Sequence, residues 1–281
     1  MNMLCTYQFV VPILVRHRLG QLKFNIRRYF TWLRSEYQHP KSSFTRIHKR
    51  IHQSRIKNCQ VDDRNENRKR DHGEYEMICP IMDSYFSQIL THMRNNFFVD
   101  EPTQKMFGMY ARGEPIPVLE KNVLEALNEG LSVMYIHIPT NQVAAVSVNG
   151  IFKPSDLVSD AKVQIEDEDI RMVFNLFTNI HRCLNLFQKY DVDKIFDIKA
   201  ISVDENHRNR GLAKAVIEKS LEIAEACGCK VVKTEGTSKF TQLAFARSGF
   251  ETVWERNYTA FICENGDPVF QPIDPHRTLK I

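Results

Sequence analysis

The chain has 281 residues, with 38 Lys and Arg against 34 Asp and Glu, a formal net charge of +4 and room for one large domain or one domain with an extension. Residues 1–72 hold 16 of the Lys and Arg but only 5 of the Asp and Glu, so the remainder is acidic. An acidic body argues against a nucleic-acid surface and mildly favours a cationic small-molecule substrate. No apolar run approaches the roughly 20 residues of a transmembrane helix.

The 7 cysteines are scattered, without a CxxC pair or the His-rich spacing of a zinc site. An odd number of separated cysteines is typical of reduced thiols in an intracellular protein. We therefore expect no metal and a cytoplasmic location.

Residues 1–72 are interpreted as a basic, disordered N-terminal extension, with a polar linker at 62–73. Apolar residues recur three or four apart between Leu19 and Leu33, with arginines among them. Two alternatives stay open: a mitochondrial presequence, which would make the location mitochondrial, and an amphipathic helix lying on anionic lipid. The folded domain is predicted to cover residues 73–281.

Hydrophobic periodicity and turn residues predict the elements of this domain. In chain order they are a strand at 75–79, helices at 82–96, 103–110 and 118–129, a hairpin of 131–138 with 142–149, a helix at 169–190, a strand at 198–203 followed by a helix, a strand at 231–235, a helix at 240–247 and a last hairpin of 251–257 with 258–264. Helices alternate with antiparallel and parallel strands, which predicts a mixed-sheet α/β fold.

The strand ending at Val203 leads through Arg208-Asn209-Arg210-Gly211-Leu212-Ala213 into an amphipathic helix. Gly211 permits a tight bend of the backbone. Such a loop directs successive backbone N–H groups, and the positive end of a helix dipole, at one point. This geometry suits a phosphate or pyrophosphate.

The motif Arg208-x-x-Gly211-x-Ala213 resembles the pyrophosphate loop of the Gcn5-related N-acetyltransferases (GNAT). Further segments resemble the insect-type arylalkylamine (dopamine) N-acetyltransferases, and together the matches extend over nearly all of residues 73–281. These segments are Phe97-Phe98-x-Asp100-Glu101-Pro102, Thr234–Thr241 closing with Ser248-Gly249-Phe250, and Pro268-Val269-Phe270-Gln271-Pro272 followed by Pro275-His276.

The resemblance implies a GNAT fold: a central sheet, mostly antiparallel, with one parallel pair of strands that splay apart, flanked by helices. It also implies that acetyl-CoA, the co-substrate, lies in the splay. The residues implied to bind it are Ile201, Ser202, Val203, Arg208, Asn209, Arg210, Gly211, Leu212, Ala213 and Lys214. For the arginines and Gly211, a solvated loop and an ordinary turn glycine are the alternatives.

Acetyl transfer to an amine requires the neutral base. An alkylamine resembles Lys, with a pKa of about 10.4, so only roughly one molecule in 2,500 is neutral near pH 7. Glu101 is the candidate general base, both because two Phe residues could desolvate it and because the resemblance places the base there, acting through water. The alternative is a helix cap, with Asp100 or Glu101 at the N-cap and Pro102 after it. Phe97 and Phe98 could form the substrate wall, although core packing is the favoured role for each.

A backbone N–H near Val203 could stabilise the developing oxyanion. The helix 240–247 offers no Tyr to protonate the departing thiolate. Thr237 and Thr241 match positions where the insect enzymes carry serines, and helix capping or a surface position is the alternative for both. His181 is expected at the surface or in packing, and His207 is expected to be a loop residue.

We therefore expect an enzyme that transfers an acetyl group from acetyl-CoA to an arylalkylamine such as dopamine, serotonin, tyramine or tryptamine, directly in a ternary complex. Acylation of polyamines or other small amines, and an inactive acyl-CoA-binding module, remain alternatives. The expected partner is a small amine, with no nucleic acid, and the chain is expected to be a monomer.

Overall fold

The computed structural model describes residues 73–107, 111–157, 166–262 and 268–281. Its centre is a five-stranded sheet in the order β1-β2-β3-β4-β5, and a second sheet pairs β6 with β7. All neighbours in the central sheet are antiparallel except β4 and β5, which are parallel. This confirms the mixed α/β, GNAT-type fold.

The interior strands of the central sheet are largely buried, whereas β1 and β6 are largely exposed. They are β1 (Tyr75–Ile78), β2 (Val133–His137), β3 (Gln142–Phe152), β4 (Ile195–Val203), β5 (Val232–Thr234), β6 (Glu255–Asn257) and β7 (Thr278–Lys280). The predicted hairpin is confirmed as β2–β3, and β3 continues three residues beyond its expected end at Asn149.

The helices lie between these strands in the chain. They are α3 (Phe86–His92), α4 (Phe98–Asp100), α5 (Pro102–Phe107), α6 (Pro117–Asn128), α7 (Glu168–Leu184), α8 (Leu186–Tyr190), α9 (Leu212–Ala226) and α10 (Lys239–Arg247), with 3-10 turns η4 (Asp83–Tyr85), η6 (Pro154–Leu157), η7 (Glu205–His207) and η8 (Tyr258–Ala260). A π-helical turn, η5 (Met93–Phe97), joins α3 to α4.

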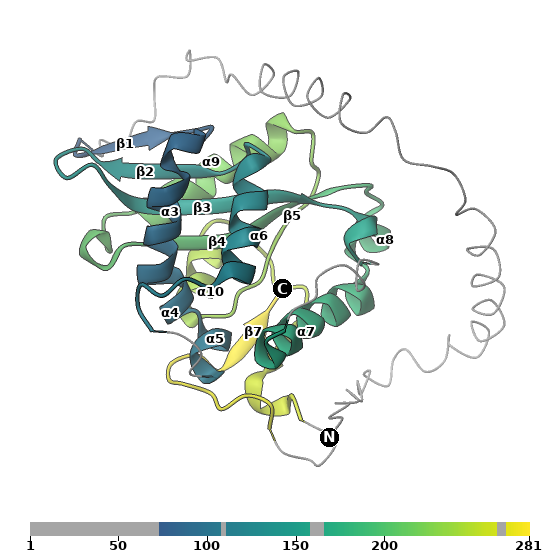
Figure 1. Ribbon diagram of the computed structural model, residues 1–281. Coiled ribbons are helices and arrows are strands. Elements are labelled where there is room, and N and C mark those ends of the chain that lie inside the picture. Colours follow the sequence, from purple (N-terminus) through teal and green to yellow (C-terminus); the bar gives the residue numbers. More distant parts are fainter. Residues whose placement is uncertain (1–72, 108–110, 158–165, 263–267) are drawn as a thin grey trace, which may run out of the picture.

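The central sheet separates two hydrophobic cores. On one face α3 and α6 pack on β2 and β3 around Ile89, Val123 and Val146. On the other face α9 packs around Phe196 and Val216. Figure 1 shows this layering, with α3 and α6 in front of the sheet and α9 behind it. A third core joins α7 to the C-terminal segment through Tyr258, Phe261 and Phe270.

Two helices differ from their predicted bounds. The helix expected at 82–96 continues through the π turn to Asp100, so Phe97 and Phe98 are helical. The helix expected at 169–190 is broken at Asn185, which adopts a left-handed conformation with φ 41° and caps α8 with its side chain. Asn tolerates this conformation better than most residues, and an amphipathic pattern by itself cannot reveal the break.

The predicted last hairpin is wrong. β6 pairs with β7 near the C-terminus, with Glu255 opposite Lys280, and residues Tyr258–Ala260 form a 3-10 turn. The turn places Tyr258 in the third core, where the residue is fully buried. The burial of an aromatic side chain has overridden the local preference for a strand.

Among the described residues, no helix is long and apolar enough to cross a membrane. The expectations for the basic extension and the linker up to residue 72 lie outside the described residues, as do the last three residues of the helix expected at 103–110.

Candidate functional site

The strands β4 and β5 separate after three parallel pairs. The register runs from Phe196 opposite Val232 to Ile198 opposite Thr234, and β4 then continues to Val203. On its other edge β4 carries a bulge, because Val148 faces Ala200 while Asn149 faces Ile198. Lys199 is therefore the extra residue, placed where the two strands diverge. The parallel pair is thus splayed.

The loop after β4 is shaped for an anion. Asn209 and Gly211 have φ values of 63° and 80°, and Gly211 is the N-cap residue of α9 with no side-chain cap. The first N–H groups of a helix have no partner within the helix. An uncapped start of a 15-residue helix beside two arginines fits a pyrophosphate.

Ion pairs hold the two arginines of this loop. Arg208 lies 2.9 Å from Asp100, at the end of α4, and Arg210 lies 3.6 Å from Glu74. All four side chains are between 44% and 62% exposed. Because Asp100 precedes Glu101, the pair with Arg208 brings the segment of the candidate base next to the candidate cofactor loop.

A packed aromatic group holds the start of the same loop. The hydroxyl of Tyr75 in β1 lies 3.0 Å from Nδ1 of His207. The ring of His207 lies 4.7 Å from that of His137 in β2. Burial lowers the pKa of His207, and the nearby His137 lowers it further. His207 is a buried loop residue that joins the loop to the edge of the sheet.

The strand residues implied to bind acetyl-CoA are placed together in β4. Ile201 and Val203 are half-buried and Ser202 is buried. Burial lowers the pKa of His92 to about 4, so its ring is neutral at pH 7. Since Nδ1 lies 3.1 Å from the carbonyl of Val143, which can only accept, Nε2 accepts the Ser202 hydroxyl at 2.9 Å. Ser202 is thus fixed on the α3 side of the sheet.

Glu101 lies between α4 and α5 and is 9% exposed. Its Oε2 accepts hydrogen bonds from the Thr103 hydroxyl at 2.5 Å and from the backbone N–H of Gln104 at 2.9 Å. Its Oε1 is buried with no partner among the described residues, and the same holds for Oε1 of Gln104. One oxygen of Glu101 therefore caps α5, as the alternative to the base predicts, and the other oxygen remains available for the predicted base. Asp100 pairs with Arg208 and does not serve as the cap.

The two phenylalanines of the motif lie in the first core. Phe98 is 3% exposed, and Phe97 packs against the same core with the ring centroids 6.0 Å apart. Their main role here is packing of the α3–α4 region against the sheet, which leaves little of the Phe98 ring for a substrate.

Thr237 and Thr241 lie at the start of α10, with Ser238 between them as the N-cap residue. The hydroxyls of Ser238 and Thr241 are 2.6 Å apart. The carbonyl of Thr237 accepts the hydroxyl of Tyr258 at 2.8 Å. Burial raises the pKa of Tyr258, and the charge of Glu101 raises it further.

Three residues near the candidate site were not recognised from the sequence, namely Tyr258, Ser238 and Gln104. Ser238 could have been recognised from the pattern of an N-cap residue before an apolar run. Gln104 could have been noticed as the third helical residue after an N-cap at Glu101. No local pattern indicates Tyr258, since its position depends on the turn after β6.

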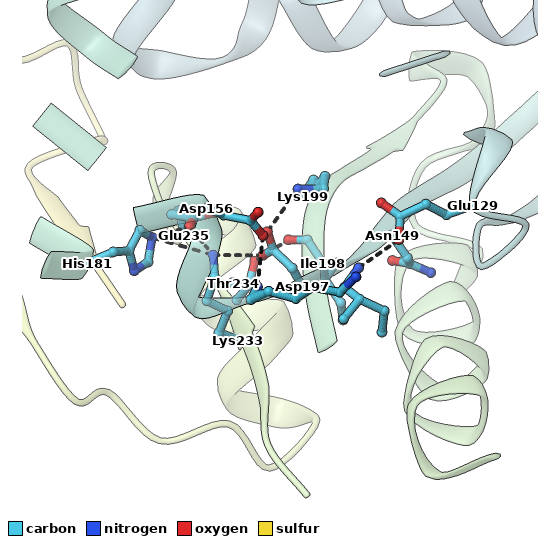
Figure 2. Close-up of polar contacts among 12 residues, drawn as sticks. Glu129, Asn149, Asp156, His181, Asp197, Ile198, Lys199, Lys233, Thr234 and Glu235 are labelled. Carbon is cyan, nitrogen blue, oxygen red and sulfur yellow. Dashed lines mark hydrogen bonds and ion pairs between the residues drawn. The ribbon is translucent and has the colours of Figure 1, made fainter. Parts of the chain in front are cut away.

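A separate group of charges is buried where β4 and β5 still pair (Figure 2). Nζ of Lys233 lies 2.6 Å from Glu235 and 2.8 Å from Oδ1 of Asp197. Both distances are those of an ion pair, although the contact with Asp197 does not have the alignment of a hydrogen bond. His181 of α7 lies 2.6 Å from Glu235, and Lys199 lies 3.2 Å from Asp197. These five residues are called the Lys233 cluster.

Burial alone would lower the pKa of Lys233, but Asp197 and Glu235 outweigh it and raise that pKa. Burial would raise the pKa of Glu235, but Lys233 and His181 lower it. His181 is buried, as expected for packing, and only its Nδ1 has no partner among the described residues. Two cations, Lys199 and Lys233, thus face the two carboxylates of Asp197 and Glu235.

Within the described part of the chain, no group of three or more His, Cys, Asp and Glu residues could hold a metal ion. The candidate ligand-binding features are the loop 208–214, the edge of β4 beyond its pairs with β5, and the two oxygens at α5 that have no partner among the described residues.

Residues 164–250 match the acetyltransferase (GNAT) family. The crystal structure of arylalkylamine N-acetyltransferase 2 from Aedes aegypti is similar at 36% identity, over 73% of this chain and 96% of that chain, with a TM-score of 0.68. A Drosophila melanogaster polyamine N-acetyltransferase is 17% identical over 73% of this chain and 97% of its own, with a TM-score of 0.63, which supports the fold alone. The chain therefore belongs to the acetyltransferase (GNAT) family of N-acetyltransferases.

Proposed function

We propose that the protein transfers an acetyl group from acetyl-CoA to the primary amine of an arylalkylamine, directly in a ternary complex, with Glu101 as the general base. The observation that carries this proposal is the buried Oε1 of Glu101, which has no partner among the described residues. The preceding residue, Asp100, pairs with Arg208 of the loop suited to a pyrophosphate. Dopamine, serotonin, tyramine and tryptamine are the proposed substrates. Similarity to the Aedes aegypti arylalkylamine N-acetyltransferase supports this class.

The residues divide the work. Acetyl-CoA supplies an activated acetyl group on a thioester, held by the loop 208–214 and the free edge of β4. Oε1 of Glu101 accepts a proton from the bound ammonium, directly or through water, which breaks an N–H bond and exposes the nitrogen lone pair. Thr103 and the N–H of Gln104 keep Oε2 occupied, so a single oxygen is left for the substrate. Thr237 and Thr241 are proposed to assist protonation of the departing CoA thiolate.

The charges favour a substrate with one cationic centre. Asp100 is paired with Arg208, and the carboxylates of Asp197 and Glu235 are neutralised by Lys233 and Lys199. A polyamine carries a second cation that gains from another free carboxylate. Of these four carboxylates, Glu101 is the one without a cation among the described residues, which suits a single amine, and the aromatic ring of the substrate adds apolar contact.

The test measures thiol release from acetyl-CoA with a panel of arylalkylamines, agmatine and spermidine. Glu101→Gln preserves the shape and the acceptor at Oε2 but removes the base, so kcat/KM is expected to fall about 100- to 10,000-fold. Glu225→Gln, on the exposed side of α9, is the matched control and should retain activity. Affinity for acetyl-CoA, measured by calorimetry, should be unchanged in both variants.

Unchanged turnover in Glu101→Gln would refute the assignment of the base. Lost affinity for acetyl-CoA in that variant would contradict a role confined to proton transfer. Higher kcat/KM with agmatine or spermidine than with every arylalkylamine would overturn the substrate class, and binding of acetyl-CoA without thiol release would indicate an inactive binding module.

A further inference from the structure

Two side-chain oxygens at the start of α5 have no hydrogen-bond partner in the part of the chain that the structure describes. They are Oε1 of Glu101 and Oε1 of Gln104, and each atom is buried. Polar atoms buried in folded proteins nearly always have hydrogen-bond partners, since an unpaired one destabilises the fold. Both oxygens are acceptors, and together they call for a ligand that offers several donors.

The freedom of Gln104 follows from the way α5 begins. With Glu101 as the N-cap and Pro102 first in the helix, Gln104 occupies the third helical position. In a capping box, the side chain there bonds back to the N–H of the N-cap residue. Here that N–H donates to the carbonyl of Phe97 at 2.9 Å. Only one of the two hydrogen bonds of a capping box is therefore formed, from the N–H of Gln104 to the side chain of Glu101. The return bond, from the N–H of Glu101 to the side chain of Gln104, is not formed.

We propose that the side-chain carbonyl of Gln104 accepts a hydrogen bond from the primary amine of the substrate, beside Oε1 of Glu101. This inference rests on the proposed function and names a further residue that contacts the amine. A primary ammonium offers three N–H donors at one centre, which suits two acceptors carried by the same turn at the start of α5. No other class of substrate group supplies as many donors on a single atom.

Gln104 would hold the amine through the proton transfer. When Glu101 takes one proton, an N–H bond breaks and an O–H bond forms, and the neutral amine keeps two N–H groups. One of these can stay with Gln104 while the lone pair turns to the acetyl carbon. A neutral amide does not compete for the proton, so Gln104 positions the nitrogen without altering the base.

The test is Gln104→Met, which preserves length and removes the acceptor. The KM for tryptamine is expected to rise about tenfold, the loss expected for one hydrogen bond to a charged group, while the KM for acetyl-CoA is unchanged. The melting temperature of the protein without ligands should hold or rise, because a buried unpaired acceptor has been removed.

Gln242→Met is the matched control for stability. The side-chain amide of Gln242 donates to the carbonyls of Gly236 and Thr278 at 2.8 and 2.7 Å, so its replacement should lower the melting temperature. A Gln104→Met variant that melts as low as Gln242→Met would show that Gln104 serves the fold, and would overturn the inference.

An unchanged KM for tryptamine in Gln104→Met would also overturn it, while leaving the proposed function intact if the wild type acetylates arylalkylamines. A wild type that acetylates none of them would remove both proposals. An equal rise in KM for both substrates would point to general damage and count against a contact with the amine.

Discussion

The charges of the Lys233 cluster are paired with one another, whereas the first turn of α5 leaves two oxygens open. In the cluster, each charged group has a partner at 2.6 to 3.2 Å within the protein. At α5, Glu101 and Gln104 each keep a buried acceptor that no described residue satisfies. Burial of polar groups is costly in both regions. In the first the cost is offset inside the fold, and in the second a ligand must offset it.

The difference separates two kinds of buried polar residue. Shifted pKa values alone would indicate the Lys233 cluster as the functional site, since the pKa values of Lys233 and Glu235 are strongly shifted. Structural ion-pair networks shift pKa values as well. A missing hydrogen bond alone does not separate the regions either, because Oδ1 of Asp197 and Nδ1 of His181 in the cluster also lack one. The difference is that Asp197 Oδ1 is held by Lys233 at 2.8 Å, whereas Oε1 of Glu101 and Oε1 of Gln104 have no described cation or donor.

The largest expected effect concerns the Lys233 cluster, whose charges are paired within the protein. Lys233→Met removes the cation between Asp197 and Glu235 and should lower the free energy of unfolding by about 3–5 kcal/mol, as for other buried pairs that lose one partner. Urea denaturation would measure it. Lys199→Met is the control, because Lys199 pairs with the same Asp197 but its side chain is 39% exposed. A stable Lys233→Met variant that loses amine turnover would break the comparison and assign the cluster to function.

The pH dependence of stability provides an intermediate effect. Because the pKa of His92 is lowered to about 4 from 6.5, the unfolded chain binds a proton more readily than the folded protein. Stability is therefore full above pH 6.5 and falls as the pH drops toward 4, by about 1.4 kcal/mol per unit and about 3 kcal/mol in all. Urea denaturation at pH 7, 6 and 5 would measure the decline.

His92→Gln should flatten this decline, although His207 and His276, whose pKa values are also lowered, keep part of it. A profile as steep as that of the wild type would show that His92 is not the group responsible. A flatter profile would place His92 with the buried polar residues that are satisfied within the fold, since its partners are Val143 and Ser202.

The smallest effect concerns the exposed pair of Asp100 with Arg208. Such pairs contribute little to stability, so Asp100→Asn should leave the melting temperature unchanged. It frees Arg208 for a phosphate, and the KM for acetyl-CoA should fall about twofold at low salt, with the gain lost at high salt. A rise in that KM would show that Asp100 positions Arg208 rather than competing with the cofactor for it.

Particular residues show how far the sequence could predict the site. Gly211 and its strand–loop–helix setting are local, and the structure places them as expected. Glu101 was predicted as a base with a helix cap as the alternative; the structure shows the cap on one oxygen and leaves the other without a described partner. Phe98 could not be assigned, because an aromatic residue beside a motif has the same pattern whether it contacts a core or a substrate.

By itself, the sequence determined the mixed α/β fold, the loop into α9 and the segment that carries Glu101, because periodicity, glycine and capping residues act over a few neighbours. The tertiary structure alone decided that β6 pairs with β7, that Tyr258 bonds the carbonyl of Thr237, and that Oε1 of Gln104 has no partner among the described residues. Each of these depends on burial and on contacts between segments far apart in the chain. Hydrogen-bond satisfaction is a property of the whole packed fold, and the open acceptors at α5 become visible only there.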